Sequence, residues 1–211
     1  MNSDIKKYKL SEVYNPENPY DEYAAGIESF FFNLSEVLNR TNEETPYSVF
    51  EDEIQEIINS HNLNYPAINS SNYSEEDEIY FNDFVKDYLK DASDNGIVEA
   101  SLMSEINILS SDDEYIKDHE YIRSDLLCFI SQIKFNFYYL EEIIIYYAPN
   151  YDERHSNCIG NHLNDIYNDN LAAQIIFVAT LPSSFLSIVA ECAYLAAFKP
   201  NHPDCQNGWM N

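Results

Sequence analysis

The residues best suited to metal chemistry form a short cluster around residue 160. His155, Cys158 and His162 follow one another at intervals of three and four residues, and His202 and Cys205 lie nearer the C-terminus. Zinc binds these ligand types in sets of four, so the cluster is the candidate site for a metal-dependent hydrolase. Its spacing corresponds to no standard zinc finger, however. A polar loop with an incidental thiol is the simpler interpretation, and we expect no metal or other cofactor.

Residues 91–102 resemble part of a calcium-binding loop. Oxygen-bearing side chains occupy the first, third and fifth positions, and Gly96 occupies the sixth. An EF-hand also needs a bidentate glutamate at position twelve, where this chain has Leu102. We therefore interpret the segment as the end of a helix at Gly96 followed by a turn. The four glycines of the chain are too far apart for a phosphate-binding loop, and no complete catalytic motif is present.

Charge is the most distinctive property of the chain. The 211 residues include 37 acidic and 11 basic side chains, which gives a formal net charge of −26. The acids are concentrated between Leu10 and Glu120, a stretch with 27 acidic and 4 basic residues. From Tyr121 onward there are 9 acidic and 4 basic residues. Strong uncompensated charge governs association rather than fold. A solubilising surface would not require this segregation, so we interpret the acidic half as a recognition surface.

The charge also restricts the class of partner. A compact chain of this length has a diameter of about 43 Å, and duplex DNA carries about 26 charges over about 44 Å. The protein therefore approaches DNA in net charge per unit length, which argues against direct binding to nucleic acid and favours a basic protein. The acids that we expect to contact such a partner fall in three clusters: Glu51, Asp52, Glu53 and Glu56; Glu75, Glu76, Asp77 and Glu78; and Asp112, Asp113 and Glu114.

The elements that must position these residues are helices. Apolar residues recur with helical spacing, and Ser74 with Asp77 forms a capping box. The sequence predicts an all-α, single-domain bundle of about six to eight helices, with the apolar C-terminal half as a buried core. Residues 1–19 are expected to form a loose arm and residues 20–211 the domain. Its acidic outer helices should lie within 20–120, at 21–39, 46–60, 74–95 and 97–109, and its core helices within 121–198.

The longest predicted helix runs from residue 112 to residue 147, with a break near His119. Its second half carries apolar residues at strict 4-3-4-3 spacing, and other faces are apolar as well, which is typical of a central buried helix. The alternative is a pair of strands through residues 135–139 and 143–147, because aromatic and β-branched residues favour strands. The length of the periodic pattern favours the helix.

The sequence of the C-terminal region predicts a helical hairpin, with helices at 165–181 and 183–198 and a hinge at Pro182. The segment Leu171–Phe198 contains one charged residue, so a membrane-associated helical protein is an alternative. Pro182 and the polar side chains within the segment argue against a membrane span and favour a core hairpin. Four cysteines without a CxxC pair and the absence of an apolar run after the first lysines favour a cytoplasmic protein with reduced thiols.

The function expected from these features is non-enzymatic. An acidic surface on rigid helices is suited to inhibiting a basic partner protein, such as a toxic nuclease neutralised by an immunity protein. A phage-type inhibitor of host defence, or a nucleic-acid mimic that blocks a DNA- or RNA-binding complex, shares the same physics. Tyrosines among the acids, namely Tyr73, Tyr80 and Tyr115, are the expected anchors of such an interface. The sequence does not indicate the oligomeric state.

Overall fold

Helix α7 (Glu120–Tyr147) is the central element of the fold. The computed structural model describes residues 8–60, 66, 68, 72–147 and 182–199. In this part of the chain the secondary structure is entirely helical, as the sequence predicted, and it forms a single all-α domain. The other elements are α1 (Leu10–Val13), the 3-10 helix η1 (Pro19–Tyr23), α2 (Ala24–Arg40), α3 (Tyr47–Ser60), α4 (Glu75–Asn95), α5 (Ile97–Leu109), α6 (Glu114–Asp118) and α10 (Pro182–Phe198). Of these, η1, α2, α4, α5, α6 and α10 pack against α7.

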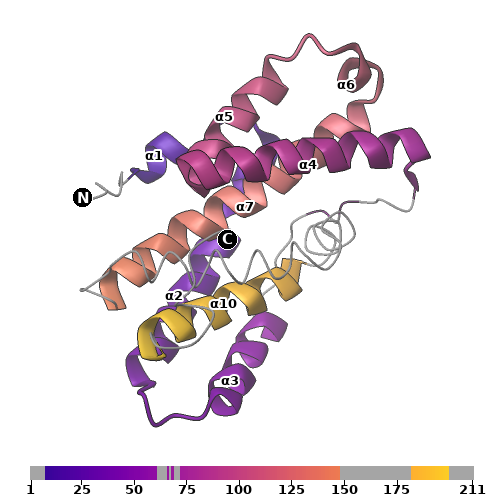
Figure 1. The fold of residues 1–211 in the computed structure, drawn as a ribbon. Helices are drawn as coiled ribbons and strands as arrows, with labels where there is room; N and C mark the ends of the chain where they lie inside the picture. The colour runs from indigo at the N-terminus through magenta and orange to yellow at the C-terminus, as the bar shows by residue number, and fades with distance from the viewer. Residues whose placement is uncertain (1–7, 61–65, 67, 69–71, 148–181, 200–211) are drawn as a thin grey trace.

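Helix α7 is buried on nearly every side. Leu126, Ile130 and Leu140, which belong to the predicted periodic pattern, are 0% exposed. Helices α4, α5 and α6 pack with α7 at one end of the molecule, and α2, α3 and α10 lie toward the other (Figure 1). Residues 135–139 and 143–147 are helical, so the alternative of a strand pair is wrong. The predicted break is also confirmed, because α6 and α7 are separated at His119.

The core extends further toward the N-terminus than the sequence predicted. Helix α2 buries Phe30 and Leu34 completely, and Phe31 packs against Tyr139 of α7 with ring centroids 5.7 Å apart. An outer helix therefore supplies a full apolar face to the core, because its hydrophobic residues recur every three or four positions.

The N-terminal segment is attached to the bundle at two buried positions. Val13 is 0% exposed and Asn18 is 2% exposed. The Asn18 side chain caps η1 by accepting a hydrogen bond from the backbone N–H of Tyr20, and it donates one to Glu105 of α5 at 2.6 Å. Val13 and Asn18 therefore anchor this stretch to the bundle, and the division into an arm over 1–19 and a domain over 20–211 stays a prediction. Residues 1–7 lie outside the described part.

Gly96 is the single residue between α4 and α5. Its φ of 90° and ψ of 153° are accessible essentially to glycine alone, and its N–H caps α4 by donating to the Ala92 carbonyl at 2.9 Å. This confirms the interpretation of the calcium-like segment as a helix end and a turn. The sharp turn lays α4 and α5 against each other and against α7.

Helix α10 is the described half of the predicted C-terminal hairpin, and it belongs to the core. Tyr194 is 2% exposed, lies 4.8 Å from the Phe50 ring between centroids, and donates a hydrogen bond to the Thr45 carbonyl at 2.9 Å. Residues 165–181 lie outside the described part. None of the helices described here has the length and apolar character that crossing a membrane requires.

Candidate functional site: an acidic groove along helix α4

The first predicted acidic cluster lies on α3, apart from the other two. Glu51, Asp52 and Glu56 are exposed there. Glu53 is partly buried and pairs with Arg40 of α2, whose Nε lies 3.0 Å from Glu53 Oε2. Helices α3 and α4 are at opposite ends of the molecule in Figure 1. The structure therefore does not join this cluster to the acids of α4 and α6.

The second and third clusters meet where α4 begins beside α6. Glu75, Glu76 and Glu78 are exposed on the first turn of α4, and Glu114 is exposed on α6. Asp77 differs from its neighbours because it is 1% exposed. Its carboxylate points inward and accepts hydrogen bonds from other side chains, whereas Glu75, Glu76 and Glu78 face the solvent; the role of this cluster in partner binding stays a prediction.

The Asp77 carboxylate joins three helices. It accepts hydrogen bonds from the hydroxyls of Tyr115 at 2.7 Å and Tyr121 at 2.9 Å, and from the backbone N–H and the hydroxyl of Ser74 at 2.8 Å each. Burial alone would raise the pKa of Asp77. The hydrogen bonds from Tyr115, Ser74 and Tyr121 outweigh burial and hold this pKa well below its usual value. Asp77 thus fixes α4 to α6 and α7.

The α6 cluster is fixed in a similar way. Asp113 caps α6 by accepting from the backbone N–H of Tyr115 at 2.8 Å, and it accepts from the Tyr80 hydroxyl at 2.8 Å. Burial, together with the hydrogen bond to Asp113 and the charge of Asp113, raises the pKa of Tyr80 to about 12. Asp112 pairs with Lys117 at 2.7 Å across an exposed surface. Hydrogen bonds from tyrosine hydroxyls to Asp77 and Asp113 therefore hold together the helices that carry the exposed carboxylates of this corner.

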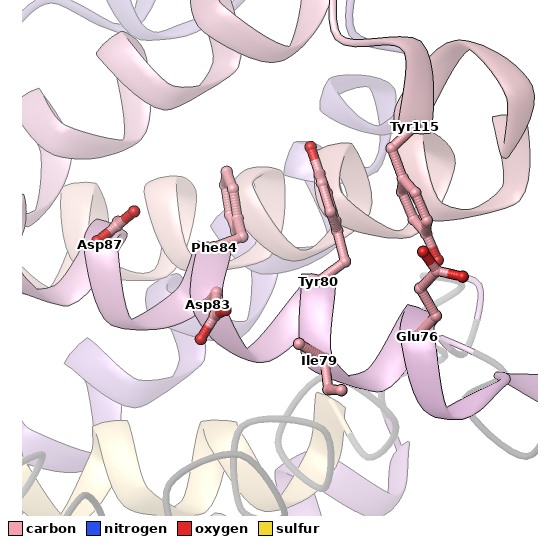
Figure 2. Close-up of a pocket in the computed structure, with 7 residues that line it drawn as sticks. All are labelled: Glu76, Ile79, Tyr80, Asp83, Phe84, Asp87 and Tyr115. Carbon is pink, nitrogen blue, oxygen red and sulfur yellow. The ribbon is translucent and has the colours of Figure 1, made fainter.

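An open groove of about 480 Å³ runs along α4 beside this corner. Figure 2 shows the rings of Phe84, Tyr80 and Tyr115 in a row, with carboxylates of α4 along the same stretch of the helix. The residues that line it are Glu76, Ile79, Tyr80, Asp83, Phe84, Asp87 and Tyr115. The groove thus combines aromatic rings with carboxylates, which is chemically suited to an organic cation.

The aromatic wall of the groove is built by ring stacking. The Tyr80 and Tyr115 centroids are 4.6 Å apart with an interplanar angle of 16°, and Tyr115 stacks in turn on His119 at 4.3 Å. The sequence analysis anticipated Tyr80 and Tyr115 at this surface. Tyr73 is different, because it donates to Asp125 at 2.7 Å, and burial and that hydrogen bond raise its pKa.

The sequence analysis missed Asp83 and Asp87 as members of this surface. A signal was present, because residues 76, 80, 83 and 87 are separated by steps of four, three and four residues, and Phe84 lies four residues after Tyr80. Such steps place side chains on one face of a helix. Acids that are adjacent along the chain point in different directions from a helix, whereas acids three or four residues apart share a face.

A second charged cluster lies inside the bundle and was also missed. Lys134 of α7, Asp21 of η1 and Glu105 of α5 are at most 1% exposed, and Lys134 Nζ lies 2.6 Å from Asp21 Oδ2 and 2.7 Å from Glu105 Oε1. One cation faces two carboxylates, and burial raises the pKa of Asp21 despite the opposing effect of Lys134. The cluster connects the N-terminal segment to α5 and α7 and is closed to solvent.

The predicted metal ligands His155, Cys158 and His162 lie outside the described residues. Within the described part, no three His, Cys, Asp or Glu side chains lie close enough together to hold a metal ion. Comparison with known proteins gives no match to a family model, to a curated protein or to a solved structure.

Proposed function

We propose that this chain is a non-enzymatic acidic binding protein that inhibits a basic partner protein, such as an immunity protein that neutralises a toxic nuclease. The partner's lysine and arginine side chains would contact the exposed acids of α4 and α6. Opposite charge would accelerate the encounter and oppose binding to acidic proteins and nucleic acids. The oligomeric state does not enter the proposal.

The observation that carries this proposal is the way in which the acids are held. Glu75, Glu76 and Glu78 project from the first turn of α4, and that turn is anchored from below by Asp77. Carboxylates on a fixed framework lose little conformational freedom on binding, so more of the electrostatic attraction remains as affinity. A merely solubilising surface has no need of such an anchor.

We further propose that the protein acts in the cytoplasm. Cys128 is a buried free thiol, and burial raises its pKa to about 12. An inert, unpaired thiol is compatible with a reducing compartment.

Capture of a partner from source cells tests the proposal. Immobilised full-length protein should retain a basic protein at low salt and release it in a salt step. The released protein, once purified, should lose its activity on DNA or RNA when one equivalent of this chain is added. An acidic partner, or a partner whose activity is unaffected, would contradict the proposal.

A pair of matched variants localises the interaction. The triple variant Glu75→Gln, Glu76→Gln, Glu78→Gln should weaken binding of the captured partner about tenfold, because it removes three charges from the contact surface. The control Glu22→Gln, Glu28→Gln, Glu36→Gln removes the same charge from exposed positions of η1 and α2. It should change the affinity less than about twofold. Equal effects would show that only net charge matters.

The alternative function, a phage-type anti-defence inhibitor or nucleic-acid mimic, has a distinct signature. Its partner would be a DNA- or RNA-binding complex, and duplex or single-stranded nucleic acid would compete with this chain for one site. Competition assays on the captured partner distinguish it from a nuclease whose catalytic cleft is blocked.

A further inference from the structure

The groove on α4 has a composition that selects for a particular kind of ligand. It pairs the rings of Tyr80, Tyr115 and Phe84 with the carboxylates of Glu76, Asp83 and Asp87. Aromatic faces carry negative electrostatic potential, so both kinds of group attract a cation and repel an anion. The volume of about 480 Å³ is at the lower end of the range found for pockets that take organic ligands.

The aromatic wall is fixed before any ligand arrives. The Tyr80 hydroxyl is held by Asp113 at 2.8 Å, and the Tyr115 hydroxyl is held by Asp77 at 2.7 Å. The two stacked rings therefore have both a packing partner and a hydrogen-bond partner. Tyr115 is stacked between Tyr80 and His119, so a ligand would stack on Tyr80 or Phe84. It does not have to order the Tyr80 ring, which reduces the entropic cost of binding.

The carboxylates of the groove lack strong cationic partners. Between the residues that the structure describes, the side chains of Glu76 and Asp87 make no hydrogen bond or ion pair. Asp83 pairs with Lys86 at 2.8 Å, but both side chains are at least 60% exposed. An exposed pair of this kind contributes little and exchanges readily. The groove therefore presents negative charge that an incoming cation can neutralise.

An arginine side chain fits these features better than other cations. Its guanidinium is planar and weakly hydrated, stacks on aromatic rings and donates to carboxylates along its edge. A lysine ammonium is more strongly hydrated and does not stack. A metal ion needs converging ligands, which the described residues do not offer.

We propose that the groove lined by Tyr80, Phe84, Asp83 and Asp87 receives an arginine side chain of a basic partner protein. This inference rests on the proposed function, because the partner supplies the arginine. It adds a point of specificity to an interface that would otherwise depend on net charge.

A tripeptide titration tests the groove without knowledge of the partner. The probe is acetyl-Gly-Arg-Gly amide, added to isotopically labelled full-length protein at low ionic strength, with amide shifts followed by NMR. Saturable shifts are expected for residues 76–87 and for Tyr115. The lysine counterpart should bind about 2- to 5-fold more weakly, because it loses the stacking contribution. The neutral citrulline counterpart should not saturate.

Matched variants separate the groove from the general field of the protein. Asp83→Asn with Asp87→Asn should weaken arginine-peptide binding about tenfold, whereas Glu28→Gln with Glu36→Gln at exposed positions of α2 makes the same change in net charge and should leave it within about twofold. Phe84→Leu keeps an apolar side chain but removes an aromatic face, and it should abolish the preference for arginine over lysine. Thermal melts of each variant check that the fold is retained.

Different results would contradict the arginine site and the proposed function. Shifts spread equally over α3 and α4, or equal effects of the two double variants, would overturn the arginine site while leaving a salt-dependent partner interaction intact. Equal affinity for the arginine, lysine and citrulline peptides would overturn it as well. Failure of the proposed function would be seen separately, as a captured partner whose activity this chain does not inhibit.

Discussion

At the scale of single residues, the unexpected feature is the buried ion cluster of Lys134, Asp21 and Glu105. Asn18 donates to Glu105 at 2.6 Å, and the backbone N–H of Asn15 donates to Asp21 at 2.8 Å. These bonds compensate part of the cost of removing three charges from water. The sequence carried a hint, because a single lysine in a helix apolar on nearly every face is buried and needs partners. It did not reveal which of 37 acids those partners are.

Replacement of Lys134 by methionine should destabilise the protein strongly. The variant leaves two carboxylates buried without a cation, and loss of one member of a buried ion pair costs about 3–5 kcal/mol. The free energy of unfolding, measured with urea, should fall by that amount.

The triple variant Asp21→Asn, Glu105→Gln, Lys134→Met is the control for this prediction. It removes all three charges, so it should be more stable than Lys134→Met alone. A Lys134→Met variant as stable as the parent would contradict the assignment of a buried, charged cluster.

At the scale of elements, local signals were sufficient for most helix boundaries. Ser74, Gly96 and the break at His119 stand where the sequence predicted them, because caps and turns depend on neighbouring residues. The packing of residues 13–23 was not predicted, since it depends on contacts with α5 and α7 that are distant in sequence. For the same reason the sequence indicated acids near α4 and α6 but not the inward orientation of Asp77.

The joint between α4, α6 and α7 should depend on the ionisation of Asp77. The pKa of Asp77 is lowered in the folded state relative to the ordinary value of 3.8, so its stabilising effect is complete above that value. It is lost as the pH falls through the lower, folded-state pKa. Asp77→Asn removes the charge and replaces one of the two acceptor oxygens by an NH2 donor, so the hydrogen bonds from Tyr115, Tyr121 and Ser74 cannot all form, and the variant should lose about 2 kcal/mol of stability at neutral pH.

Urea unfolding of the parent and of Asp77→Asn from pH 7 to pH 2 measures this effect. The difference in the free energy of unfolding should be constant down to about pH 5 and should shrink below about pH 4. Asp52→Asn, at an exposed position of α3, is the control and should change stability by less than about 0.5 kcal/mol. A difference between parent and Asp77→Asn that grows as the pH falls would contradict the role of the Asp77 carboxylate.

At the scale of the whole molecule, the three predicted acidic clusters form two separate surfaces. One is on α3, and the other is at the corner of α4 and α6, where the groove lies. Composition predicted the sign and size of the charge, and helical periodicity predicted the fold class. The grouping of the acids into surfaces depends on how α3 packs on α2 and α10, and on how α4 packs on α5 and α7. That arrangement is tertiary, so adjacency along the chain did not reveal it.

The dependence of the association rate on ionic strength tests the central claim most directly. Stopped-flow mixing of this protein with its captured basic partner should give a rate constant that falls at least about tenfold between about 20 mM and 500 mM salt, because screening removes electrostatic steering. The dissociation rate should change much less. An association rate constant that is independent of salt over this range would contradict the account of the acidic surface as a binding surface for a basic partner.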